Sequence, residues 1–98
     1  MAKNFGKGSK FRIGDTGFQI DLDSGYTVSV QFGKYHYCSS RHGEDTDFHY
    51  NLQCTNAEVA VFDRDGEFVN LDKHDDVLGW QSVSQVLAII NKFNALDA

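Results

Sequence analysis

Apolar and polar residues alternate along two stretches in the first third of the chain. Every second residue is apolar over residues 18–22, and the same alternation runs over residues 26–32 after a turn at residues 23–25 (DSG). Side chains of a strand point alternately to its two faces, so each stretch has one apolar and one polar face. A short link that contains glycine is typical of a β-hairpin. The pattern predicts a hairpin here, with a short strand at residues 11–13 before it.

A second hairpin is predicted around residues 63–66 (DRDG). Residues 57–62 (AEVAVF) form its outgoing strand and residues 67–71 its return strand. Aspartate and glycine suit the backbone of a tight turn, because they tolerate the conformations that such turns require. The same residues superficially resemble the start of a calcium-binding loop, but that loop needs further ligands downstream. We therefore interpret residues 63–66 as a turn.

The last element predicted is a helix over residues 83–95. Ser82 and Gln85 have the spacing of a capping box, in which each side chain satisfies a backbone N–H at the helix start. At about 100° per residue, the apolar positions from Val83 to Leu96 cover roughly half of the helical wheel. The chain has no proline, so nothing in this segment interrupts the helix.

These elements predict an α+β fold for a chain of 98 residues. We expect an antiparallel sheet of four or five strands built from two hairpins, with one C-terminal helix packed on a face. Residues 11–98 form this single domain, and residues 1–10 form a flexible basic arm.

The outgoing strand of the second hairpin is apolar on both faces. Val59 and Val61 lie on one face, and Ala60 and Phe62 lie on the other. A strand of this kind needs cover on both sides, and one helix covers only one. Either residues 34–54 fold over the second face or another copy of the chain covers it. We expect a homo-oligomer.

Charge is distributed unevenly along the chain, whose formal net charge is −5. Residues 1–12 contain four basic residues and no acid, so the remainder carries −9. Proteins that bind duplex nucleic acid normally present a dense basic patch, so duplex binding is not expected. No apolar run approaches the length of a membrane span, and the start lacks the apolar core of a signal peptide. We expect a cytoplasmic protein that does not contact a membrane.

Residues 34–54 hold most of the residues that could carry chemistry. Five potential metal ligands fall within them: His36, Cys38, His42, His49 and Cys54. Zinc sites usually deliver their four ligands as closely spaced pairs. His36 and Cys38 are closer together than the usual pair, and no C-x2-C knuckle is present. We predict no metal and no cofactor. A zinc protein or a small hydrolase that uses these residues is the alternative.

Aromatic and basic residues alternate at the start of the same segment. Tyr35, His36, Tyr37, Arg41 and His42 are our candidate ligand-binding residues. Tyrosine stacks on bases and donates a hydrogen bond, and arginine binds phosphate through two parallel hydrogen bonds. This composition suits a small nucleotide or a contact with a protein. Aromatic residues that only pack against the sheet would explain it equally.

Four segments resemble small accessory proteins encoded by tailed bacteriophages. They are residues 26–33 (YTVSVQFG), 37–38 (YC), 56–63 (NAEVAVFD) and 76–82 (DVLGWQS). The resemblance implies a protein that acts in the cytoplasm of the bacterial host, by blocking a host protein or sequestering a nucleotide signal. It implies no catalytic residues. We therefore predict a non-catalytic binding protein, with a structural component of the virion as a further alternative.

Overall fold

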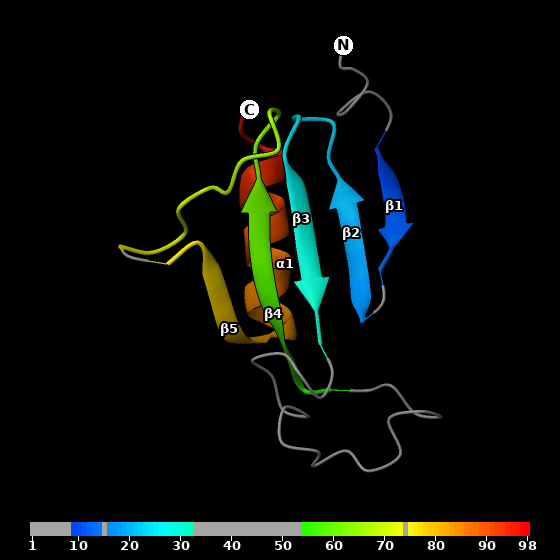
Figure 1. Ribbon diagram of the computed structural model, residues 1–98, viewed down its shortest axis with the longest axis vertical. Coiled ribbons are helices and arrows are strands. Elements are labelled where there is room, and N and C mark those ends of the chain that lie inside the picture. The colour runs from blue at the N-terminus through cyan, green and yellow to red at the C-terminus, as the bar shows by residue number, and fades with distance from the viewer. Residues whose placement is uncertain (1–8, 15, 33–53, 74) are drawn as a thin grey trace.

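The computed structural model describes residues 9–14, 16–32, 54–73 and 75–98. They form a five-stranded antiparallel sheet, with the strands side by side in chain order, and one helix (Figure 1). The elements are β1 (Lys10–Ile13), β2 (Gly17–Asp21), β3 (Thr27–Gln31), β4 (Asn56–Phe62), β5 (Val77–Ser82) and α1 (Val83–Asn94). The predicted α+β architecture is confirmed.

The first predicted hairpin is present as β2 and β3. The amide of Leu22 donates to the carbonyl of Tyr26 at 2.8 Å, and Gly25 supplies the turn with a φ of 102°. A φ in this range is reached readily only by glycine. The short strand before the hairpin is β1, which pairs with β2 and begins at Lys10. Residues 1–8, most of the predicted arm, lie outside the described part of the chain.

The return strand predicted at residues 67–71 is wrong. The turn before it forms as expected, because Asp63 accepts hydrogen bonds from the amides of Asp65 and Glu67. Beyond the turn, however, β4 is bridged only by Phe68. The free edge of β4 is instead paired with β5, which runs directly into the helix. Pairing at this edge brings the start of α1 onto the sheet, where its apolar face is buried.

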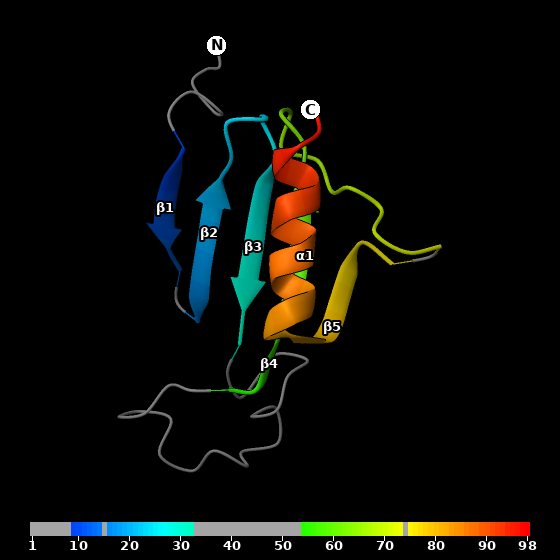
Figure 2. The ribbon, with the colours of Figure 1, turned by 180° about the vertical axis from the view of Figure 1, so that it is seen from behind.

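The helix packs on one face of the sheet and forms the core there. Valines of β3 and β4 point toward it, and Val59 and Val61 are fully buried. From α1, Phe93 packs among them and meets the ring of Tyr26 edge-to-face at 4.9 Å. Figure 2 shows α1 lying over β4, with β1 and β2 to one side of it.

The start of α1 has the predicted capping box. The Ser82 hydroxyl accepts from the amide of Gln85 at 3.2 Å, and the Gln85 side chain accepts from the amide of Ser82 at 2.8 Å. These two bonds satisfy backbone donors that a helix start leaves without intrahelical partners. They fix the position where β5 ends and α1 begins.

On the opposite face of the sheet, β4 contacts the segment that follows its turn. The ring of Phe68 lies 4.7 Å from that of Phe62, and Ala60 is buried. Phe68 is itself 52% exposed and supplies only part of the expected cover. Cover by residues 34–53, which lie outside the described ranges, or by another copy stays a prediction.

A buried carboxylate joins β1 to the polar side of the sheet. Asp21 is 1% exposed, accepts from the Arg12 guanidinium at 2.7 Å, and accepts from the Thr27 hydroxyl at 2.8 Å. The Lys10 ammonium lies 3.9 Å from its second carboxylate oxygen. Because the carboxylate is out of water, these neighbours replace part of its lost hydration. The cluster therefore holds the edge strand by a charge interaction.

Three distant segments meet at the turn between β2 and β3. The carbonyl of Ser24 accepts from the Arg64 guanidinium and from the amide of Ala98, both at 3.0 Å. Arg64 also lies against Gly25, where any added Cβ would overlap its guanidinium. These bonds tie the turn of the first hairpin to Arg64 and to Ala98.

Replacing Arg12 should destabilise the fold through Asp21. Arg12→Leu removes the strongest partner of a buried charge, and we expect the free energy of unfolding to fall by about 3 kcal/mol. Adding Asp21→Asn should recover about 1–2 kcal/mol, because the orphaned charge is then gone. Urea unfolding of the two variants and the wild type measures both changes. A double variant no more stable than Arg12→Leu would contradict this role of Asp21.

Glycine is required at position 17 because two backbones approach closely there. A Cβ at Gly17 would overlap the Val30 carbonyl of the neighbouring strand and lie 2.9 Å from the Cα of Gln31. Gly17→Ala should therefore cost about 1–3 kcal/mol, since β2 must shift. Gly14→Ala is the control, because its nearest neighbour would be at an ordinary 3.5 Å. Equal unfolding midpoints for the two variants would contradict the close approach.

Candidate functional site

One helix leaves part of the apolar sheet face open. Adjacent strands lie about 4.8 Å apart, whereas a helix with its side chains is about 10 Å wide. Because α1 lies over β4, it does not reach β1 and β2 (Figure 2). On β1, Phe11 is 79% exposed and Ile13 is 94% exposed. The open part of this face is therefore apolar and accessible.

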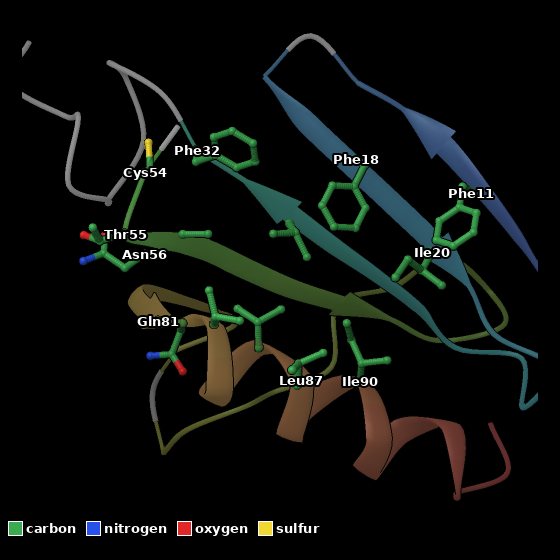
Figure 3. Close-up of a pocket in the computed structure, with 14 residues that line it drawn as sticks. Phe11, Phe18, Ile20, Phe32, Cys54, Thr55, Asn56, Gln81, Leu87 and Ile90 are labelled. Atoms are coloured by element: carbon green, nitrogen blue, oxygen red, sulfur yellow. The ribbon is translucent and has the colours of Figure 1, made fainter. Parts of the chain in front are cut away.

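An apolar groove of about 450 Å³ runs between α1 and these strands. Its floor contains Phe18 and Ile20 of β2, and Phe11 of β1 stands at its outer side (Figure 3). Leu87 and Ile90 of α1 form the opposite wall (Figure 3). Every one of these side chains is apolar, so the groove can stabilise a ligand mainly by removing apolar surface from water.

The polar groups of the groove gather toward one end. Cys54, Thr55, Asn56 and Gln81 lie there (Figure 3). The Gln81 amide donates to the carbonyl of Gly79 at 3.1 Å, whereas the Asn56 Oδ1 is buried without a hydrogen-bond partner. None of the described residues that line the groove carries a charge. Among these described residues, the groove therefore offers no cationic side chain to bind phosphate.

The groove wall is a second apolar stripe on α1. Val83 and Leu87 lie roughly 120° around the helix from Ile89 and Phe93, which face the sheet, at about 100° per residue. Val86 and Ile90 lie between these two pairs, and both residues contact the core and line the groove. The stripe is accessible, since Val83 is 66% exposed and Leu87 is 54% exposed. At this angle the stripe points sideways from α1. A ligand that occupied the uncovered part of the sheet would therefore contact it.

The ligand-binding residues predicted from the sequence lie outside the described residues. This holds for Tyr35, His36, Tyr37, Arg41 and His42, so the structure neither brings them together nor separates them. Nucleotide binding by these residues stays a prediction.

Most of the residues that were considered as metal ligands also lie outside the described ranges. Of the five potential ligands, only Cys54 is described, and it is half-buried in the groove. Within the described ranges, no group of three or more His, Cys, Asp or Glu residues could hold a metal ion. Within the same ranges, no helix has the length and apolar character to cross a membrane.

Sequence reasoning missed the groove, although one signal for it was present. The apolar positions of the helix cover about half of the wheel, which is more than one contact face needs. The width of this arc indicates a second contact surface on α1. The alternation of apolar and polar residues in β1 and β2 does not show whether a helix covers their apolar face.

Edge strand β5 contains a bulge with an unusual backbone at Trp80. Two residues of β5, Gly79 and Trp80, lie opposite Glu58 alone, because the pairing shifts between Ala57 and Val59. Trp80 has a φ of 58° and is 50% exposed. Left-handed backbone is unfavourable for any residue with a Cβ. The bulge also makes β5 a poor template for a further strand.

No protein-family model, curated protein or solved structure matches the chain.

The strain at Trp80 predicts a reversed order of stability for two variants. Trp80→Gly should be more stable than Trp80→Ala by about 1 kcal/mol, because both lose the indole but only alanine keeps a Cβ in left-handed backbone. In an ordinary strand the order would be the opposite. Thermal and urea unfolding of both variants measures the difference. A more stable alanine variant would show that the position is not strained.

Proposed function

We propose that this protein is a non-catalytic binding protein whose groove accepts an amphipathic helix from a partner protein. The observation that carries the proposal is the apolar side stripe of α1, which faces the open strands β1 and β2 across the groove. A helix laid beside α1 would contact both the stripe and the groove floor. Binding of an amphipathic helix in an apolar groove is a recurrent mode of recognition between proteins.

Burial of the exposed apolar side chains would stabilise such a contact. Fully burying a leucine or phenylalanine side chain contributes about 1.5–3 kcal/mol relative to leaving it in water. Phe11, Ile13, Val83 and Leu87 are each more than half exposed in the single chain. Apolar patches of this kind on a small protein commonly mark a site of interaction. We expect Phe11 and Leu87, on opposite sides of the groove, to dominate binding.

The chemistry of the groove restricts the partner. Its helix should carry apolar residues toward both the sheet and α1, and it should have no charge at the contact, because the lining residues offer no opposite charge. The resemblance to phage accessory proteins makes a bacterial host protein the first partner to test. A protein can block its target simply by binding to it, so this function needs no catalytic residues.

Co-purification with groove variants tests the proposed function. Wild type, Phe11→Lys, Leu87→Glu and Lys92→Glu are produced with the same affinity tag in bacterial cells, and the proteins retained by each are compared. Lys92 is exposed and lies on the side of α1 away from the stripe, so Lys92→Glu is the matched control. We expect one partner to be retained by wild type and control and reduced at least tenfold with both groove variants, because a charge placed in an apolar contact costs more than about 1.4 kcal/mol.

Two outcomes would contradict this function. One is a partner that both groove variants retain as well as wild type does, since binding would then use another surface. The other is equal loss with Lys92→Glu, which would point to a general effect of charge on α1. Circular dichroism of each purified variant establishes that it is folded.

A further inference from the structure

We infer that the outer edge of β1 accepts an extended acidic segment of another protein as an additional strand of the sheet. This edge lies beside the groove but is a separate surface, so its use is independent of the proposed function. A sheet edge binds an extended segment through backbone hydrogen bonds, and the side chains of the edge strand select the sequence of that segment.

The two edges of the sheet differ in how well they can pair with a further strand. In the strand order, β1 and β5 are outermost, and none of the described strands pairs with the outer side of β1 (Figure 1). The β5 edge is bulged, and Trp80 interrupts its extended backbone. In contrast, β1 pairs with β2 in an unbroken register from Lys10 to Ile13. A regular outer strand can extend a sheet, whereas a bulged one resists pairing.

The register shows which backbone groups of β1 face outward. The amide of Gly14 donates to the carbonyl of Gly17 at 2.8 Å, so these two residues form a hydrogen-bonded pair. Bonded and non-bonded pairs alternate along an antiparallel ladder. Two residues before Gly14, Arg12 is therefore bonded to β2, and Ile13 between them directs its N–H and C=O outward. The same alternation turns the backbone groups of Phe11 outward.

The two residues with outward backbone groups also have exposed apolar side chains. Phe11 is 79% exposed and Ile13 is 94% exposed. They share one face of the sheet, because alternate residues of a strand point the same way. A strand added at this edge would place its own side chains about 5 Å from theirs. Apolar residues at those positions would shield both side chains from water.

The other face of β1 carries positive charge at the surface. Lys10 and Arg12 point there, with side chains that are 54% and 42% exposed, and β1 contains no acidic residue. Asp21, the acid beside both cations, is 1% exposed. An acidic residue directly opposite either cation would form a stabilising cross-strand pair. The edge therefore favours a strand in which apolar and acidic residues alternate.

Charge disfavours a second copy of β1 at this edge. In an antiparallel pair of two β1 strands, one register pairs both Phe11 and Ile13 with the same two residues of the other copy. That register places Arg12 directly opposite Arg12 of the second copy. Like charges that lie directly opposite are destabilising. The occupant that fits the edge is therefore an acidic segment of a different protein.

A pair of peptides tests the predicted chemistry of the occupant. The probe is a capped peptide of about seven residues in which valine and glutamate alternate, and its counterpart has lysine in place of glutamate. Calorimetry with the full chain should show binding of the glutamate peptide. The lysine peptide should bind about tenfold more weakly, because the cross-strand charge pairs change from attraction to repulsion.

A proline variant tests the outward backbone groups. Ile13→Pro should weaken binding of the glutamate peptide about tenfold, because proline removes an outward N–H and directs its ring toward the incoming strand. The ladder between β1 and β2 is retained, since the lost donor does not face β2. Ile13→Val keeps the donor and the branched side chain and is the matched control. Circular dichroism establishes that both variants are folded.

Amide hydrogen exchange of the wild type locates the peptide without any substitution. On binding, the amides of Phe11 and Ile13 gain hydrogen bonds, so their exchange should slow about tenfold or more. The amide of Arg12 is already bonded to β2 and serves as the internal reference. Its exchange should change less than that of its two neighbours.

Several results would overturn the inference. They are a glutamate peptide that does not bind or binds no better than the lysine peptide, unchanged exchange at Phe11 and Ile13, and equal affinities of folded Ile13→Pro and Ile13→Val. Binding that Leu87→Glu abolishes and Ile13→Pro retains would also overturn it, because the peptide would then occupy the groove. The co-purification experiment uses neither peptide nor a variant of Ile13, so each proposal can fail while the other stands.

Discussion

The structure depends on the packing of a single helix against a sheet that is wider than the helix. In the described part of the chain, α1 is the only helix, and it buries its apolar face over β4 and the adjoining strands. Core valines on β3 and β4 lose their contact with water there, which is the main favourable contribution to folding. The same geometry leaves β1 and β2 open, because one helix spans only about two strands. The position of α1 over β4 therefore produces both the core and the groove.

The remaining contacts hold the uncovered strands in place without covering them. On the polar side of the sheet, Arg12 and Asp21 attach β1 to β2 through a charge pair with one buried partner. At the strand ends, Ser24 joins the first hairpin to Arg64 and the chain end. An edge strand that is kept in place by polar contacts can present Phe11 and Ile13 to a partner. This rigidity lowers the conformational cost of binding.

Much of the fold could be predicted, but little of the site. The first hairpin and the capped helix follow from local signals: alternation, a turn with glycine, and the Ser82–Gln85 box. The partner of β4 could not be derived in this way, because residues 67–71 and 77–82 can both follow it and only packing of α1 selects the second. The predicted ligand-binding residues, Tyr35 to His42, lie outside the described ranges. The groove was not predicted, since exposure depends on which strands the helix reaches.

The sequence by itself determined the elements and their faces. The alternation in β2 and β3 fixes which side chains share a face, because neighbouring residues of a strand point in opposite directions. The tertiary structure alone decided the strand order and the position of α1 over β4. These depend on contacts between residues far apart in the chain, which no local pattern records. The groove exists because those contacts place the helix to one side of the sheet.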